Sequence, residues 1–320
     1  MDPLQIVLIV LAAAVLLVVA FAYVCFRLVF YSAARKPLPE GEYDIPEGDI
    51  YEEFREDMVN WQKALAETKC KTFEITSRDG LSLIGRYYEY APGAPLEIMF
   101  HGYRGNAVRD LSGGVERCFN LQRNTLIVSQ RAHGDSDGHV ITFGYYEKYD
   151  CLDWVNFAVH HFGDDQKIIL TGISMGAATV LMASGEKLPE NVVCILADCG
   201  YSSTRDIIRK VLRDIHLPAP IVYPFIRLGA IIFAGFDPNK CNPIEQVKKT
   251  QVPIIFIHGD TDDFVPCYMS RQMYDVCPTE KAIYICEGAG HGLAFPKDQQ
   301  KYYAAVKDFD KVWNKQIHIN

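Results

Sequence analysis

The sequence lacks paired-cysteine motifs and long basic stretches, and both absences narrow the class of protein it encodes. Its ten cysteines are scattered, and none is spaced as C-x-x-C. Zinc sites and disulfide frameworks use clustered cysteines, so we expect no metal and interpret these thiols as mostly buried and reduced. With no Lys/Arg run and a formal net charge of −8, nucleic acid is not expected as a partner.

Internal repeats and low-complexity tracts are also absent, so the chain is not a repeat array or a disordered tail. Its 320 residues are 49% hydrophobic and 22% charged, which is close to the globular average. This length fits one large α/β domain with an appendage.

A long hydrophobic run opens the sequence. Residues 6–26 carry no charged side chain, and a helix of about 20 residues crosses the hydrocarbon core of a bilayer. We therefore expect a single-pass transmembrane anchor within residues 1–31. Arg27, Arg35 and Lys36 follow the run, which places the remaining domain in the cytoplasm by the positive-inside tendency; the many unpaired thiols agree.

The alternative for this run is a secretory signal peptide. Ser32-Ala33-Ala34 would serve as its cleavage site, but no basic residue precedes the run and the run is long for a signal.

Residues 32–70 are expected to form a connector and a juxtamembrane helix. The proline-rich, acidic part up to Asp49 has no helical pattern. After it, a helix that packs on the main domain is predicted, with Asp49 and Glu52 in a capping-box arrangement. The apolar residues recur at helical spacing, namely Ile50, Phe54, Met58, Trp61 and Leu65.

From residue 71 to 320, strand and helix patterns alternate. An Asp79-Gly80 turn signal joins the first two strands in a hairpin. Continuous apolar runs then recur at 96–100, 124–129, 167–172, 191–198, 252–259 and 281–286. Such runs are typical of buried parallel strands. We predict a mostly parallel, twisted sheet with helices on both faces, and a site beyond the carboxyl ends of its strands.

Residues 172–176 (GISMG) form a G-x-S-x-G element. The pentapeptide alone is a weak signal, but here it directly follows an apolar strand and directly precedes a helical run. That is the strand–turn–helix setting in which a serine hydroxyl is lifted toward a base. Ser174 is therefore the candidate nucleophile.

A second loop, MFHGYRGN at 99–106, follows the first parallel strand. We expect its Tyr103 backbone N–H, together with that of Met175, to form an oxyanion hole. His101 is interpreted as a structural residue that hydrogen-bonds the loop.

The acid and the base should follow the nucleophile in chain order. Asp262 is the preferred acid after the strand at 252–259. Asp260 is the second candidate but is interpreted as a turn residue, and Asp263 is expected to be exposed. His291 lies in a glycine-rich loop after the last strand, where it suits proton transfer. Three other histidines, His101, His133 and His258, lie near the ends of strands. Packing or loop hydrogen bonds are enough to explain their presence there.

Together these segments resemble α/β-hydrolases of the bacterial serine aminopeptidase/esterase-like group over residues 71–310. The matching pieces are HGYRGN (101–106), QRAHGDSDGHVITFG (130–144), GISMGAATV (172–180), HGDTDDFVP (258–266) and GAGHG (288–292). The resemblance implies the α/β-hydrolase fold and assigns the acid to Asp262, three residues before Val265. Ala132 stands where the family carries a glycine.

An apolar insertion lies between the strands at 191–198 and 252–259. We expect a small helical lid over about 200–250, whose apolar face covers an acyl pocket or touches the bilayer; ordinary core packing is the alternative. Three prolines and Arg227 argue against a second membrane span.

The leading hypothesis is a serine hydrolase that cleaves a carboxylic ester or thioester through an acyl-enzyme, with Ser174, His291 and Asp262 as the triad. Its substrate would be a small acyl compound, with lipid-like compounds among the candidates, and no cofactor is expected. An amidase, peptidase or acyltransferase would use the same triad. A catalytically silent, membrane-tethered binding module is the alternative of another class.

Overall fold

In the computed structural model, residues 2–33 and 41–316 are described. Eight strands form one sheet in the order β1-β2-β4-β3-β5-β6-β7-β8. β1 and β2 are an antiparallel hairpin, β2 is antiparallel to β4, and every later pairing is parallel. The strands are β1 (Cys70–Thr76), β2 (Ser82–Tyr88), β3 (Leu96–Phe100), β4 (Asn124–Val128), β5 (Ile168–Ile173), β6 (Val192–Asp198), β7 (Ile254–Gly259) and β8 (Lys281–Cys286).

Helices cover both faces of this sheet, as the alternating pattern predicted. On one face the core joins the strands to helices α4 (Glu147–Phe162), α5 (Met175–Ala183), α8 (Pro243–Val247) and α9 (Tyr268–Val276). On the other, α3 (Ala107–Asn120), α10 (Ala294–Lys297) and α11 (Gln299–Gln316) cover the sheet. Strands β3, β4 and β7 are buried along their whole length, because apolar side chains cover both of their faces.

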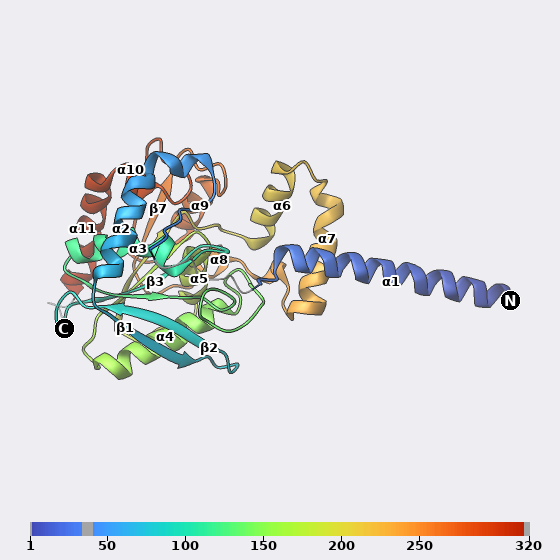
Figure 1. Cartoon of the computed structure of the whole chain (residues 1–320), viewed down its shortest axis with the longest axis horizontal. Helices are drawn as coiled ribbons and strands as arrows, with labels where there is room; N and C mark the ends of the chain where they lie inside the picture. Colours follow the sequence, from blue (N-terminus) through green and yellow to red (C-terminus); the bar gives the residue numbers. More distant parts are fainter. Residues whose placement is uncertain (1, 34–40, 317–320) are drawn as a thin grey trace.

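Helix α1 (Pro3–Val29) projects from this body (Figure 1). By length and composition it is able to cross a membrane, and most of its surface has no contact with the rest of the chain. Its carboxyl-terminal part packs on α7 (Ala219–Gly229) and on the π-helical turn η2 (Ala230–Ala234).

The insertion between β6 and β7 consists of α6 (Thr204–Asp214), α7, η2, the 3₁₀ turn η3 (Pro238–Lys240) and α8. Helices α6 and α7 pack on each other, and α7 lies across α1 at the end of the body (Figure 1). The segment at 200–250 is therefore helical, as expected.

The helix expected after the connector is present, but it begins differently. Residues Asp49–Phe54 form the 3₁₀ helix η1, and α2 runs over Arg55–Glu67. The predicted capping box is wrong: no side chain caps η1, and Glu52 instead pairs with Arg55 at 2.6 Å. Helix α2 packs on α3, and in Figure 1 it lies on the far side of the body from the exposed part of α1.

Candidate active site

Ser174 occupies the sharp turn between β5 and α5. Its backbone has φ 57° and ψ −115°, a strained conformation for a residue with a Cβ. A Cβ on Gly172 would lie 2.1 Å from the carbonyl of Gly176, and a Cβ on Gly176 would lie 2.0 Å from the Phe100 oxygen. Both glycines are needed because strand β3 and helix α5 approach so closely here.

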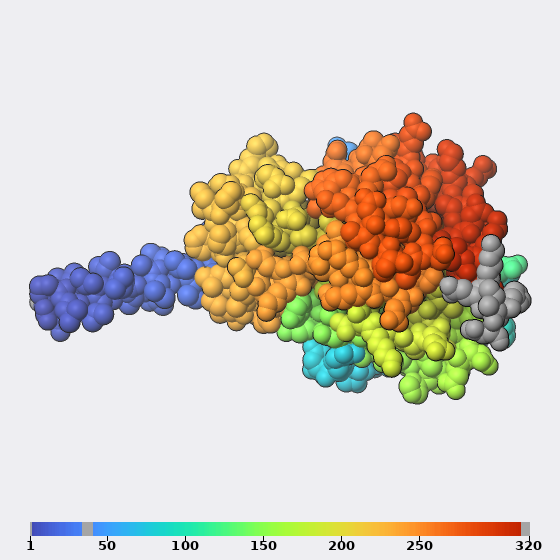
Figure 2. Space-filling view, turned by 180° about the vertical axis from the view of Figure 1, so that it is seen from behind, coloured from blue at the N-terminus to red at the C-terminus, as the bar shows by residue number. Residues whose placement is uncertain are grey.

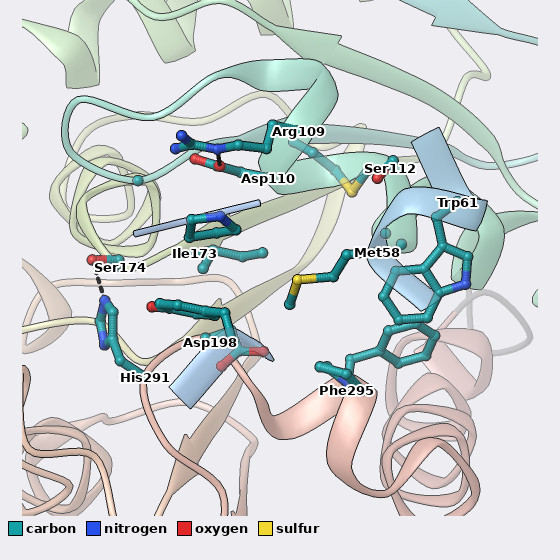
Figure 3. Close-up of a pocket in the computed structure, with 18 of the residues that line it drawn as sticks. Met58, Trp61, Arg109, Asp110, Ser112, Ile173, Ser174, Asp198, His291 and Phe295 are labelled. Atoms are coloured by element: carbon teal, nitrogen blue, oxygen red, sulfur yellow. Dashed lines mark hydrogen bonds and ion pairs between the residues drawn. The ribbon is translucent and has the colours of Figure 1, made fainter. Parts of the chain in front are cut away.

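His291 lies over this turn with its imidazole between two partners. Its Nε2 is 2.9 Å from the Ser174 Oγ, and its Nδ1 is 2.7 Å from the Asp262 Oδ2 (Figure 3 draws the first contact). The three residues selected from the sequence therefore meet at the carboxyl ends of β5, β7 and β8. In this arrangement Nδ1–H donates to the carboxylate, which leaves Nε2 free to accept the serine proton.

Asp262 is held by more than His291. Its Oδ1 accepts the backbone N–H groups of Phe264 and Val265 at 2.9 and 2.8 Å, and its Oδ2 lies 3.1 Å from the Nε2 of His258. Burial alone would raise the pKa of this carboxyl, but the hydrogen bonds and charges of His258 and His291 lower the pKa well below its ordinary value. Asp262 therefore stays ionised and aligned.

The alternative acids have other roles. Asp260 accepts the Gly288 N–H at 2.7 Å and so holds the loop that carries His291. Asp263 is exposed, as expected. Among the other histidines, His101 contacts the Gly102 oxygen and the Gln130 N–H, and His133 accepts the N–H of Arg104 at 3.0 Å. These contacts agree with structural roles for both.

The loop after β3 lies against the nucleophile. A Cβ on Gly102 would be 3.6 Å from the Ser174 Cβ, and the next residue, Tyr103, lines the cavity beside Ser174. Met175 is the first residue of α5, and its N–H has no acceptor within the helix. These are the two residues whose backbone N–H groups were expected to donate to an oxyanion.

This loop is also tied to the end of α1, which sequence reasoning missed. The Tyr103 hydroxyl donates to the Val29 oxygen at 2.7 Å, and the Arg104 guanidinium donates to the oxygens of Leu28 and Tyr31 at 2.7 and 3.2 Å. The last carbonyls of a helix have no intrahelical partner, so these two side chains complete the end of α1.

A cavity of about 650 Å³ opens beside Ser174 and His291. In Figure 3 it extends from these two residues past Met58 to Trp61 and Phe295. Its walls come largely from the segment 46–61 and from α3.

This corrects the expectation that the insertion at 200–250 covers the pocket, because none of the described residues that line the cavity belongs to it. The insertion packs on α1 instead. The segment 46–61, which covers the cavity, has no long apolar run that would identify it in the sequence. Only the apolar spacing of Met58 and Trp61 indicated that this segment has a buried face.

The cavity wall also has polar groups. Asp198, at the end of β6, is buried and accepts the hydroxyl of Tyr302 at 3.2 Å. Burial raises the pKa of Asp198 to about 6. Arg117 also lines the cavity and is fixed by the buried carboxylate of Glu97. The cavity thus combines apolar walls with a few polar groups, as small-molecule sites commonly do.

Ala132, which stands where the family carries a glycine, lies in a loop held by several contacts. Ala132 adopts φ 62°, the left-handed conformation that glycine favours, and its N–H donates to the Asp137 oxygen at 2.8 Å. Neighbouring Arg131 pairs with Asp150 and Asp79. The surrounding contacts therefore hold the alanine in a strained backbone.

Cys199 lies behind the triad, and ligand atoms of Cys199, Asp262 and His291 fall within 4.8 Å of one another. Asp262 and His291 already bond each other, so this cluster suits a triad better than a metal site. All ten cysteines are free thiols, eight of them buried.

The fold and the cavity define an α/β-hydrolase with the architecture of a serine hydrolase. The chain belongs to the prolyl oligopeptidase family, whose model matches residues 142–316, just over half of its length. The predicted α/β-hydrolase fold is thereby confirmed, and the chain is a hydrolase.

Solved structures share this fold. The esterase Pf2001 of Pyrococcus furiosus has a TM-score of 0.67 at 18% identity, over 89% of this chain and 99% of its own. The acylaminoacyl peptidase of Pyrococcus horikoshii has a TM-score of 0.57 at 18% identity, over 76% of this chain and 41% of its own. At these identities the likeness concerns the fold alone.

The relatives by sequence include uncharacterized proteins. The uncharacterized protein YqkD of Bacillus subtilis is 28% identical over 74% of this chain and 78% of its own. Protein bem46 of Schizosaccharomyces pombe is 24% identical, over 65% of this chain and 66% of its own. An uncharacterized membrane protein of Saccharomyces cerevisiae, YNL320W, is 23% identical over 58% of this chain and 60% of its own.

Proposed function

We propose that this protein is a membrane-anchored acyl hydrolase that cleaves a carboxylic ester or thioester. The observation that carries the proposal is the hydrogen-bond chain from Ser174 Oγ through both nitrogens of His291 to Asp262, with distances of 2.9 and 2.7 Å. A serine aligned in this way has a base within reach and a carboxylate that orients the base.

In the first half-reaction, Ser174 Oγ attacks the substrate carbonyl while its proton moves to His291 Nε2. The carbonyl oxygen becomes an oxyanion, which the backbone N–H groups of Tyr103 and Met175 stabilise. The imidazolium, held by Asp262, then protonates the leaving alcohol or thiol as its bond to the carbonyl carbon breaks. The acyl group remains on Ser174 as an ester.

In the second half-reaction, water replaces the leaving group. His291 removes a proton from the water as its oxygen attacks the acyl carbon, and the same oxyanion donors act again. When the intermediate collapses, the Ser174 oxygen leaves and recovers its proton from His291. The products are a carboxylic acid and free enzyme, so no cofactor takes part in the proposed cycle.

The cavity supports an acyl substrate with an apolar part. Met58, Trp61 and Phe295 lie beside the path that leads away from Ser174 (Figure 3), and such side chains favour a hydrocarbon over a strongly polar group. In ester or thioester cleavage the group that leaves is an alcohol or a thiol, which His291 protonates. Amide cleavage, and transfer of the acyl group to another alcohol, would use the same triad. Both are outcomes of the test below.

Helix α1 supports attachment to a membrane. It is long and apolar enough to cross one, and we propose that it does so once. The basic residues that follow its uncharged run 6–26, namely Arg27, Arg35 and Lys36, favour a cytoplasmic position for the hydrolase domain.

The test is labelling of the full-length protein with a fluorophosphonate probe. Wild type and a Ser203→Ala control, which changes a serine at the start of α6, should label, and Ser174→Ala should not. A panel of p-nitrophenyl esters, acyl thioesters and aminoacyl amides then compares kcat/KM. If the wild-type protein does not label, the silent binding module replaces the hydrolase; if amides are cleaved best, the peptidase alternative replaces the esterase.

A further inference from the structure

The insertion exposes a group of large apolar side chains at the end of the body from which α1 emerges. Ile221 is 65% exposed, Ile231 45% and Ile232 47%, and Ile215 and Leu217 are exposed beside them. Figure 2 shows this part of the chain directly against α1. Isolated apolar residues are common on surfaces, but a group beside an apolar helix indicates a contact surface.

Several contacts fix this surface relative to α1. The rings of Phe21 and Phe225 are 4.9 Å apart, and those of Tyr23 and Phe233 are 5.1 Å apart. Between these pairs, a Cβ on Gly229 would lie 2.3 Å from the backbone oxygen of Ala22, so the two backbones touch. Residues 225–233 therefore lie at the level of residues 21–26 of α1.

The length of α1 indicates where residues 21–26 lie relative to the hydrocarbon core of a bilayer. The exposed part from Pro3 to Val18 has sixteen residues, which span about 24 Å at 1.5 Å per residue. A hydrocarbon core is about 30 Å thick and needs about 20 residues. A spanning α1 must therefore use residues up to about Ala22, the residue that touches Gly229.

We propose that the face formed by Ile221, Ile231 and Ile232 enters the bilayer alongside α1. This inference rests on the proposed membrane attachment. Helix α7 lies across α1 in Figure 1. All of α7 is therefore at about the same depth relative to the membrane. The occupant of this face is the acyl region of the lipids.

The side chains on the domain side of Ala22 suit the next layer of a membrane. Arg27 comes five residues later, about 7 Å further along the helix, and its guanidinium stacks over the Tyr31 ring at 3.6 Å. Basic and aromatic side chains are enriched at this interfacial level. The order along the molecule is therefore apolar helix, apolar insertion face, then an Arg–Tyr pair, which matches the order of layers in a bilayer.

The test uses full-length protein in phosphatidylcholine vesicles with and without brominated acyl chains, which quench nearby tryptophan. Single substitutions to tryptophan are made at three exposed positions: Ile232→Trp on the proposed face, Leu11→Trp in α1, and Tyr90→Trp on the hydrolase body. The native tryptophans, Trp61, Trp154 and Trp313, give the background, which is subtracted with unsubstituted protein.

We expect Ile232→Trp to lose emission in brominated vesicles to an extent comparable with Leu11→Trp, and Tyr90→Trp to lose none. Quenching of Leu11→Trp without quenching of Ile232→Trp would overturn the insertion contact and leave the anchor intact. Absence of quenching at both positions would overturn the membrane attachment itself. Quenching at all three positions would show non-specific adsorption and would also overturn the proposal.

Discussion

At the scale of single residues, the site depends on how one carboxylate is selected from three neighbours. Asp260, Asp262 and Asp263 follow the same strand, and only Asp262 reaches His291, because two backbone N–H groups and His258 hold it in place. The family resemblance had pointed to Asp262 by its position three residues before Val265. The role of His258 could not be predicted, because it depends on the turn that brings Val265 back over the end of β7.

Replacing Asp262 with asparagine should lower kcat about 10⁴-fold, because an amide no longer holds the imidazole in the tautomer that accepts the serine proton. KM should change little. Steady-state hydrolysis of a p-nitrophenyl ester measures both values. Asp263→Asn, an exposed neighbour, is the matched control, and an equal loss in both variants would contradict the assignment of the acid.

A buried ion network beneath the cavity should govern stability in acid. Glu97 accepts hydrogen bonds from Arg117, Arg123 and Thr171. Burial alone would raise its pKa, but the two guanidinium groups and the hydroxyl lower the pKa to about 2. Since the folded-state pKa is below the unfolded value, this carboxylate stabilises the protein above about pH 4.5, and the contribution is lost as the pH falls toward 2.

Glu97→Gln should therefore lower the free energy of unfolding by about 3–5 kcal/mol at pH 7, because it leaves the buried guanidinium of Arg117 without its anion and removes one of the two carboxylates that pair with Arg123. The deficit relative to wild type should shrink between about pH 4.5 and pH 2. Urea unfolding at a series of pH values measures it. A deficit that is independent of pH would contradict the ionised state of Glu97, and Glu53→Gln, an exposed carboxylate, should have little effect.

At the scale of elements, the segment that covers the cavity is not the one that the sequence suggested. The apolar insertion looked like a cover for the pocket, and it packs on α1. The less apolar segment 46–61 forms the cavity wall. Hydropathy identifies an apolar face but not its partner, and both partners here are distant in sequence: Trp61 lies against Gly113, and Gly229 against Ala22.

Trp61→Ala should open the far end of the cavity and shift the preferred acyl chain toward greater length. Values of kcat/KM over a series of p-nitrophenyl esters measure the shift. Leu65→Ala, one turn later on α2 and absent from the cavity wall, should lose stability by a comparable mechanism but keep the wild-type preference. The same profile in both variants would contradict the cavity as the acyl site.

The tie between the oxyanion loop and α1 makes a second prediction at this scale. Tyr103→Phe removes the hydrogen bond to the Val29 oxygen and leaves the loop held there by Arg104 alone, so kcat should fall about fivefold, which corresponds to about 1 kcal/mol for one hydrogen bond. KM should not change. Tyr303→Phe removes a comparable hydrogen bond, to Asn120, far from the nucleophile, and its kcat should equal that of wild type. A change in stability alone would contradict the positioning role.

At the scale of the whole molecule, the sequence predicted the fold, and the meeting of Ser174, His291 and Asp262, better than it predicted their surroundings. A G-x-S-x-G turn between an apolar strand and a helix is the usual setting of a serine nucleophile, so Ser174 could be selected from local signals. The contacts of the segment directly after α1 could not be predicted: it pairs with the body through a bridge between Tyr31 and Val140 and a hydrogen bond from the Ser32 N–H to the His139 oxygen. Backbone pairings of this kind produce no periodic pattern in the sequence of either segment.

The whole account depends on Ser174 acting as the nucleophile, and peptide mapping after fluorophosphonate treatment tests this most directly. The account predicts one adduct per chain, located on Ser174, that disappears when His291 is replaced by alanine. An adduct on another residue, or equal labelling without His291, would contradict it.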